Sequence, residues 1–317
     1  MLYILLIYAT ISIAMRLSHE QQISRINDVL HVIHRDIAAP LCARDLAKVA
    51  AYSEQHFHRV FKKIVDQTIN TYIRRTRLEH AANQLMFDQA STVISVAEKC
   101  GFTSLSSFSH AFKELFKTTP AKWRMNERSH SSPPYLLDAH IAAGYERVAK
   151  LDIGDPKLVV MKQRQVAYVR HKGYGRSIAN AWETLRAWAL SQNLPFDCAN
   201  PDNLELAGQQ IGLHHSNPEW VALNECHYVA CLTIDKEITR RGVVNSLTIP
   251  GGLHAMFTLQ GQYGDLLPLI GKALNQWLPN SEFFLQTTPT LIHYRKNHFI
   301  EPDNCFDVRI YLPIAPY

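Results

Sequence analysis

A stretch in the N-terminal half of the 317-residue chain occurs twice, about fifty residues apart, and this repeat constrains the fold more than any other feature. In its first part the offset is 50, and the matched pairs are Ala47/Ala97, Ala50/Cys100 and Tyr52/Phe102. One residue is then inserted, the offset becomes 51, and the matched pairs are Ser53/Ser104, Phe57/Phe108, Phe61/Phe112, Lys62/Lys113 and Tyr72/Trp123. Such a constant register predicts two copies of one supersecondary unit.

Each copy has the pattern of two short helices joined by a tight turn. After Pro40, small and apolar residues lie on the inner face of a first helix within residues 41–50, and Ser53 is a candidate cap for a second helix that buries Phe57 and Phe61. Two short helices with about three residues between them are typical of a helix-turn-helix unit. Between the copies, Ile69 to Asp88 is expected to form one helix about 30 Å long, at 1.5 Å per residue.

The chain begins with an uncharged and mostly apolar stretch, Met1 to Met15. It is shorter than the roughly 20 apolar residues of a membrane-spanning helix, and it lacks the basic start and cleavage site of a secretory signal. We expect the apolar extension, residues 1–17, to be a non-native upstream segment, with the native start of translation near Met15; a helix packed on the protein or anchored to a membrane is the alternative. Ser18, with Gln21 as its partner, is expected to cap an amphipathic helix with apolar residues at Ile23, Ile26, Leu30, Ile33 and Ile37.

Positive charge is concentrated in the first half of the chain. Residues 1–130 contain 17 Lys and Arg against 11 Asp and Glu, whereas residues 131–317 contain 16 against 17. A basic excess confined to one half is the electrostatic pattern of nucleic-acid binding. Because successive major-groove faces of B-DNA lie about 34 Å apart, two helix-turn-helix units joined by one stiff helix could read neighbouring segments of a duplex.

Side chains that face outward on the second helix of each copy are candidates for DNA contact. They are Glu54, Gln55, His58, Arg59 and Lys62 in the first copy, and Leu105, Ser106, Ser107, Ser109, His110 and Lys113 in the second. Arg suits the guanine edge, Gln suits adenine, and Ser or Leu can touch base edges or thymine methyl groups. Lys62 and Lys113 are also candidates for phosphate contact, together with basic residues at helix ends and turns, namely Arg74, Arg75, Arg77, Lys117, Lys122 and Arg124.

The second half contains a different repeat. The pattern Tyr-Gly-x9-Leu-x2-Trp begins at Tyr174 and again at Tyr263, 89 residues later. Each copy has one predicted strand before it and two after it, so the second half is expected to be a duplicated strand-helix-strand-strand unit. Two such units would face each other about a pseudo-twofold axis and leave a groove, where small ligands tend to bind. The predicted fold is an all-α bipartite helix-turn-helix domain followed by an α+β domain of two pseudo-twofold-related repeats.

Several motifs of the first half resemble the signature of AraC/XylS-type transcription regulators, over about residues 20 to 125. They are Gly101-Phe102-Thr103-Ser104, Phe108, Phe112-Lys113 and Thr119-Pro120-Ala121-Lys122-Trp123-Arg124. The resemblance implies that base contacts are made by Gln55, His58 and Arg59 in the first copy, and by Leu105, Ser106, Ser107 and His110 in the second. The family often has Gly where this chain has Asp66 and Lys117, the residues that end the two recognition helices.

The second half resembles the GyrI-like domain, which is also fused to such DNA-binding domains in Rob-type regulators. The likeness lies in Arg170-His171-Lys172-Gly173-Tyr174, Ile249-Pro250-Gly251-Gly252, Gly261-Gln262-Tyr263 and Trp277-Leu278-Pro279. Relatives bind lipophilic cations between aromatic walls and a buried acid, and the candidate walls here are Tyr168, Tyr174, Trp220, Tyr228, Phe257, Tyr263 and Phe284. The usual Glu is replaced by Ile292. Either Glu225 supplies the negative charge, or the preferred ligand is neutral or anionic.

The predicted function is that of a cytoplasmic, sequence-specific transcription regulator rather than an enzyme. The expected parts are the extension 1–17, a DNA-binding domain 18–125, a linker 126–156 and an effector-binding domain 157–315. Its partners would be double-stranded DNA, RNA polymerase and a small lipophilic effector, with no membrane partner. The six cysteines include no CxxC pair, His31 and His34 have no third ligand, and GxSxG and phosphate-loop motifs are absent, so we expect no metal, cofactor or catalytic residue. The rival functions for the second half are hydrolysis of small lipophilic compounds and protein interaction.

Overall fold

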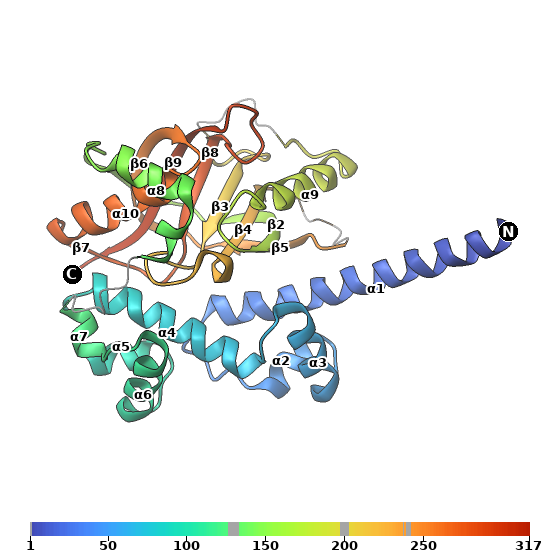
Figure 1. The fold of residues 1–317 in the computed structure, drawn as a ribbon, viewed down its shortest axis with the longest axis horizontal. Coiled ribbons are helices and arrows are strands. Elements are labelled where there is room, and N and C mark those ends of the chain that lie inside the picture. The colour runs from blue at the N-terminus through green and yellow to red at the C-terminus, as the bar shows by residue number, and fades with distance from the viewer. Residues whose placement is uncertain (1, 126–132, 197–202, 237, 239–241) are drawn as a thin grey trace. The chain divides into compact units, whose positions relative to one another are not determined.

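The chain forms two compact units. The computed structural model describes residues 2–125, 133–196, 203–236, 238 and 242–317, with side chains from Ser18 onward (Figure 1). The first unit consists of Met1–Arg77 and Ile238–Asn245, and the second consists of Leu78–Glu237 and Ser246–Tyr317. The division falls inside helix α4 (Ile69–Phe87), which is continuous and contributes residues to both units.

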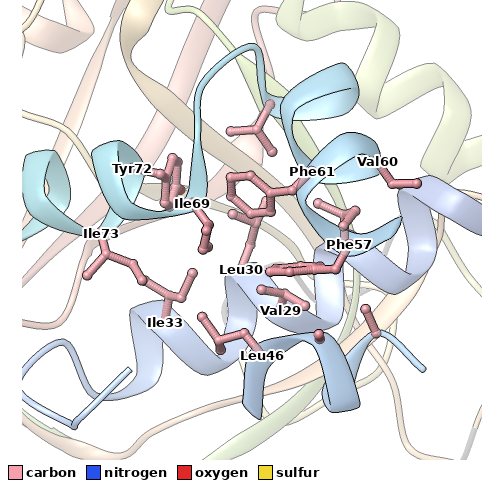
Figure 2. Close-up of a cluster of buried hydrophobic side chains, with 14 of the residues drawn as sticks. Val29, Leu30, Ile33, Leu46, Phe57, Val60, Phe61, Ile69, Tyr72 and Ile73 are labelled. Carbon is pink, nitrogen blue, oxygen red and sulfur yellow. The ribbon is translucent and has the colours of Figure 1, made fainter. Parts of the chain in front are cut away.

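The first unit contains the first helix-turn-helix copy. Its helices are α1 (Leu2–Arg35), α2 (Ala43–Val49), α3 (Glu54–Val65) and the first part of α4. Because α1 begins at Leu2, Ser18 lies within the helix, and the prediction that Ser18 caps its start is wrong. Figure 2 shows side chains from all four helices meeting in one core, including Leu30, Leu46 and Phe61.

The second copy repeats this arrangement inside the second unit. Its helices are the end of α4, α5 (Val93–Lys99), α6 (Leu105–Phe116) and α7 (Pro120–Arg124). The core formed by Phe108 and Phe112 is closed by Trp123, whose indole N–H donates to the carbonyl of Ala82 at 3.0 Å. Burial of this indole therefore leaves no unsatisfied donor, a common requirement for tryptophan in a core.

The turns of the two copies have the same hydrogen bonds, which confirms the predicted repeat. Ala51 donates its N–H to Lys48 at 3.0 Å, and Gly101 donates to Glu98 at 2.8 Å. Both turn residues have a positive φ, 52° for Ala51 and 77° for Gly101. The cap at the start of each second helix is also repeated, because Ser53 Oγ accepts the N–H three residues on, as Ser104 Oγ does.

The two recognition helices end in the left-handed conformation even though neither terminal residue is glycine. Asp66 has φ 62° and Lys117 has φ 59°, and each donates its N–H to the carbonyl four residues earlier. Glycine is the usual residue at this position because it adopts a positive φ without steric cost. In this chain the same turn is made by Asp66 and Lys117, whose side chains disfavour that conformation.

The rest of the second unit is built around a sheet to which the described residues contribute nine strands, and its pairs of known register are antiparallel. The strands are β1 (Lys157–Met161), β2 (Arg164–Lys172), β3 (Gln210–His214), β4 (His227–Thr233), β5 (Asn245–Ile249), β6 (Gly252–Gln262), β7 (Phe283–Leu285), β8 (Thr290–Lys296) and β9 (Cys305–Pro316). Their order is β1-β6-β9-β8-β3-β4-β2-β5, and β7 pairs with β9. Asn245, at the start of β5, belongs to the first unit, where it donates to the carbonyl of Ser24 at 3.0 Å.

The strand order shows the predicted pseudo-twofold axis. The first repeat is β2, α9 (Ile178–Ser191), β3 and β4, and the second is β6, α10 (Leu266–Lys272), β8 and β9. In the sheet these strands follow one another as β6-β9-β8 and then β3-β4-β2, so equivalent strands lie at equal distances from the central β3–β8 pair. The predicted fold class is confirmed.

Both repeat helices cover the same face of the sheet. Trp182 of α9 contacts Tyr294 of β8, and Trp277, in the π-helical turn Ala273–Trp277 that follows α10, contacts Phe257 of β6. The side chains that alternate with these along the strands form a separate apolar cluster on the opposite face, which includes Tyr168.

Short elements complete the second unit. The segment expected to be a linker contains a 3-10 turn, η1 (Pro134–Leu137), and a helix, α8 (Ala139–Val148), which packs against α10. Two more 3-10 turns are η2 (Leu223–Glu225) and η4 (Leu278–Asn280). Among the residues that the structure describes, no helix combines the length and apolar character needed to cross a lipid bilayer.

The two turn residues give a paired stability prediction. Because an L side chain is disfavoured at positive φ, Ala51→Gly should raise the free energy of unfolding of the first unit by roughly 1 kcal/mol. At the equivalent position of the second copy, Gly101→Ala should lower that of the second unit by a similar amount. Urea unfolding of the full chain checks both, and a loss of stability in Ala51→Gly would contradict the argument.

Candidate functional site

The outer face of α3 is polar and accessible because its other face is buried. Phe57 and Phe61 are fully buried, which turns the intervening side chains outward. Of the base-contact candidates, Gln55 and Arg59 are exposed and His58 is half-buried. Lys62, a phosphate candidate, is exposed near the end of the same helix.

The outer face of α6 is also accessible but carries smaller side chains. Leu105, Ser106, Ser107, His110 and Lys113 are all exposed, and Leu105 retains 42% of its surface although it is apolar. Ser107 is already engaged locally, because its hydroxyl donates to the carbonyl of Ser104 at 2.9 Å. Contact with a base by Ser107 would therefore compete with the cap of the helix.

Arg77 differs from the other basic candidates because its guanidinium is bound within the protein. Arg77 donates to the carbonyls of Ile37 and Ala39 at 2.9 and 2.8 Å, so it holds the loop between α1 and α2 in place. Of the remaining phosphate candidates, Arg74, Lys117 and Lys122 are exposed and Arg75 is half-buried, whereas Arg124 is half-buried with its Nε and Nη2 atoms inside the protein.

The groove between the two repeats is nearly closed. Tyr174 and Tyr263, the equivalent tyrosines of the two repeats, both line it, as do the equivalent residues Ile178 and Leu267. The space between them is about 30 Å³, which is room for about one water molecule. Two of the eight predicted pocket residues are thus brought together on the pseudo-twofold axis.

Helix α8 closes this groove. Ile141 of α8 lines the groove and is 3% exposed, and Gly144 lies so close to Gly264 that a side chain there would overlap with the Gly264 carbonyl. Arg147 at the end of α8 donates to Asp265 Oδ1 through Nε and Nη2, at 3.0 and 2.6 Å. An apolar side chain of the protein itself therefore occupies the position expected for a ligand.

The other predicted pocket residues lie elsewhere. Tyr168 is in the apolar cluster on the opposite face of the sheet, and Phe257 is buried against Trp277. Phe284 on β7 contacts Tyr317. Tyr228 is buried directly beneath the groove, with its hydroxyl 3.3 Å from that of Tyr294.

The two acidic positions of the pocket hypothesis have different surroundings. Glu225 forms an ion pair with Lys172 at 2.9 Å, with 31% of its side chain exposed. Ile292, at the usual position of the acid, is fully buried on β8 and pairs with Gly212 of β3. In this structure the groove therefore receives no negative charge from either position.

Trp220 belongs to a second and larger cavity. The cavity has a volume of about 840 Å³ and lies between the second helix-turn-helix copy and the sheet domain, all within the second unit. The indole of Trp220 packs into the core of that copy, with ring centroids 5.3 Å from Trp123 and 6.3 Å from Phe87. The sequence places Trp220 among the groove walls, whereas its contacts are with the DNA-binding part of the chain.

Three buried histidines near the groove and the larger cavity are candidate functional residues that the sequence analysis does not identify. His214, at the end of β3, lines both the groove and the larger cavity, and neither of its ring nitrogens has a hydrogen-bond partner. Burial lowers the pKa of His214 to about 3, that of His298 beside the groove to about 3, and that of His80 on α4 to about 4. All three are therefore neutral at pH 7. The sixteen histidines of the chain suggest metal binding, but no sequence pattern indicates that these three are buried as neutral polar side chains.

Comparison with known proteins agrees with the two-part architecture. The sequence profile of the GyrI-like small molecule binding domain matches residues 154–315, and that of a helix-turn-helix domain matches residues 46–126. The TetD protein of transposon Tn10 from Escherichia coli is 38% identical over 102 residues, which are 32% of this chain and 73% of TetD.

Two further proteins illustrate the similarity of the helical half. The transcriptional activator AarP of Providencia stuartii is 32% identical over 136 residues, which are 43% of this chain and 99% of AarP. Among solved structures, the DNA-binding domain of AdpA in complex with a target DNA aligns with 32% of this chain and 92% of its own length, at 21% identity and a TM-score of 0.32.

The buried histidines predict sensitivity to mild acid. Because burial lowers the folded-state pKa of His298 from 6.5 to about 3, the unfolded state binds the proton first, and the free energy of unfolding falls as the pH falls below about 6.5. His298→Phe should therefore reduce the slope of the free energy of unfolding against pH by up to about 1.4 kcal/mol per pH unit. The effect should be measured between about pH 6 and 5, because carboxylates titrate below this range.

Urea titrations of the full chain at a series of pH values measure this slope. Phe299→Leu is the matched control, since Phe299 contacts the His298 ring with centroids 4.1 Å apart and carries no titratable group. It should change the stability and leave the slope unaltered. An identical slope in His298→Phe and the unsubstituted chain would refute the assignment.

Proposed function

We propose that the chain, which belongs to the GyrI-like small molecule binding family over residues 154–315 and carries an AraC-type helix-turn-helix pair before it, is a DNA-binding transcription regulator controlled by an effector. The observation that carries the proposal is the accessibility of one polar face on each of α3 and α6. Each face has the same caps, the same buried aromatic pair behind it and a basic residue near its C-terminal end.

The proposed contacts divide into base reading and phosphate binding. Bases are read by Gln55, His58 and Arg59 of α3 and by Leu105, Ser106, Ser107 and His110 of α6. Phosphates are held by Lys62, Arg74, Arg75, Lys113, Lys117, Lys122 and Arg124. The long side chains of α3 suit hydrogen bonds to guanine and adenine, whereas exposed Leu105 suits a thymine methyl group.

The connector between the copies supports reading at two places. Helix α4 is continuous over 19 residues, so it is about 28 Å long at 1.5 Å per residue. This length is comparable with the roughly 34 Å between successive major-groove faces on one side of a duplex. We therefore propose that one chain reads two adjacent major-groove segments.

The proposed effector control rests on a physical connection within the second unit. The segment from His214 to Trp220 begins beside the groove of the sheet domain and ends in the core of the second helix-turn-helix copy. Along it, Asn217 donates to Asn83 of α4 at 3.3 Å. A ligand that binds better to one arrangement of this segment would shift the population of DNA-competent molecules.

Selection of bound fragments from sheared genomic DNA tests the proposal as a whole. The full chain should recover a small set of sites that share two short motifs about one helical turn apart. Recovery of random fragments with no common motif, or failure to retain any duplex at low salt, would exclude a sequence-specific regulator.

Arg59 provides a test of base reading. Replacing it with Ala should weaken binding to the selected site by about 1 to 3 kcal/mol and relax the preference at one base pair, because a guanine edge loses its bidentate partner. Binding isotherms on the selected site and on its single-base variants measure this. Glu98→Gln, an exposed change on α5, serves as the control. Equal weakening on every sequence would instead identify Arg59 as a phosphate contact.

Lys113 provides a test of phosphate binding. Lys113→Ala should weaken binding to all sequences alike and reduce the slope of log affinity against log salt by about one, because one fewer counterion is released. The matched control is Lys99→Ala, since the Lys99 ammonium donates to Ser91 at 2.8 Å and lies 3.8 Å from Asp88. A salt slope that Lys113→Ala leaves unaltered would remove this residue from the interface.

A further inference from the structure

The larger cavity has the volume of a small-molecule site. Its volume of about 840 Å³ is within the usual range of small-molecule pockets, whereas the groove between the repeats has about 30 Å³. Its walls come from α4, α6 and α7, from residues 133–135 and Tyr145 of α8, from residues 214–220, from α10 and the turn after it, and from residues 285–290. A ligand there would contact both the helical and the sheet parts of the second unit.

The cavity is separate from the groove, although two residues, His214 and Leu267, line both. His214 lines both spaces, with its ring held edge-on against Tyr174 and Tyr228 at centroid distances of 4.8 and 5.2 Å. The groove side is filled by Ile141 of α8. A ligand of drug-like size can therefore enter the cavity while α8 stays in place, but it cannot enter the groove.

The lining combines aromatic surface with neutral hydrogen-bonding groups. Trp123 and Trp220 meet at one wall with their rings at 77°, and Asn83, Gln84 and Asn217 contribute amides. Neither ring nitrogen of His214 has a partner, although only 9% of the residue is exposed. A buried polar group without a partner is costly, so a ligand that hydrogen-bonds to His214 would remove that cost.

The charges of the lining disfavour a cationic ligand. Among the described residues that line the cavity, Glu219 is the one carboxylate, and it already accepts a hydrogen bond from Asn275 at 2.5 Å. The lining also contains Lys117, which caps the end of α6, and Lys272 of α10, and their ammonium groups already donate to the backbone carbonyls of Glu114 and Leu151. Burial lowers the pKa of His80, His214 and His215, so these rings carry no charge at pH 7.

We propose that this cavity is a binding site for an uncharged aromatic molecule with hydrogen-bonding groups, distinct from the groove between the two repeats. The aromatic part lies against Trp123 and Trp220, and a hydrogen-bonding group meets the imidazole of His214. Since the same walls belong to the second helix-turn-helix copy and to the sheet domain, the ligand contacts both. The proposal concerns binding alone, so its failure would leave the DNA-binding proposal untouched.

The probe is N-phenylnaphthylamine, an uncharged fluorophore with one N–H donor, added to the full chain. Anilinonaphthalene sulfonate has the same rings plus a negative charge, and ethidium is an aromatic cation. We expect one N-phenylnaphthylamine per chain, bound at least tenfold more tightly than either charged probe, which corresponds to about 1.4 kcal/mol. Tighter binding of ethidium would overturn the assigned ligand class.

Two glycine substitutions distinguish the cavity from the groove. A Cβ at Gly271 would meet Glu219 and Asn275, both in the cavity wall, at 3.7 and 4.0 Å, so Gly271→Phe fits the backbone and fills the cavity. Gly175 lines the groove and has open space around it, so Gly175→Phe is the matched control. Gly271→Phe should weaken N-phenylnaphthylamine binding at least tenfold, and Gly175→Phe should change it less than twofold.

Other outcomes overturn the proposal. Loss of binding in Gly175→Phe but not in Gly271→Phe would place the probe in the groove, and equal binding by both variants would indicate non-specific adsorption. If Gly271→Phe does not fold, as judged by its thermal transition, then Asn275→Trp narrows the same cavity from the next helical turn. Undiminished binding by a folded Asn275→Trp variant would equally exclude the cavity.

Discussion

The antiparallel pairing of β3 with β8 is the interaction on which the second unit depends. It joins the two repeats into one sheet, with Gly212 opposite Ile292 at its centre and His214 opposite Thr290 at its end. Because these central strands are hydrogen-bonded on both sides, their ends are fixed, and both hollow regions take walls from them. The chain that leaves β3 then carries Trp220 into the helical part. The end of β3 thus contributes to the groove and to the larger cavity, and it begins the segment that joins the sheet domain to the second helix-turn-helix copy.

Periodic features of the sequence predicted the fold well. The two internal repeats gave both helix-turn-helix copies and the symmetric strand order, because each repeat preserves the spacing of buried residues such as Phe57 and Phe108 and so preserves the element that buries them. The start of α1 was not predicted, since Ser18 has the chemistry of a cap wherever it lies. Helix α8 falls within the predicted linker 126–156, because the hydrophilic, turn-rich residues 126–134 before it indicate the end of the helical half.

The candidate site was less predictable than the fold, for reasons of long-range packing. Tyr174 and Tyr263 are predicted as groove walls by the resemblance to the GyrI-like domain, and the repeat places them at equivalent positions. Trp220 is predicted to line the groove but packs against the second helix-turn-helix copy, because the sequence of a loop does not indicate which hydrophobic core its aromatic residue joins. The roles of His214 and Ile141 depend on which residues cover them, and that depends on contacts between segments more than seventy residues apart.

Helix α8 makes the two repeats unequal. Gly264 of the second repeat is covered by Gly144, whereas the equivalent Gly175 of the first has open space beside it. A duplicated fold begins with two identical surfaces, and here one of them has become an internal contact of the chain. A side chain at Gly264 would therefore overlap with α8, whereas one at Gly175 would meet open space, so the two repeats tolerate different substitutions at equivalent positions.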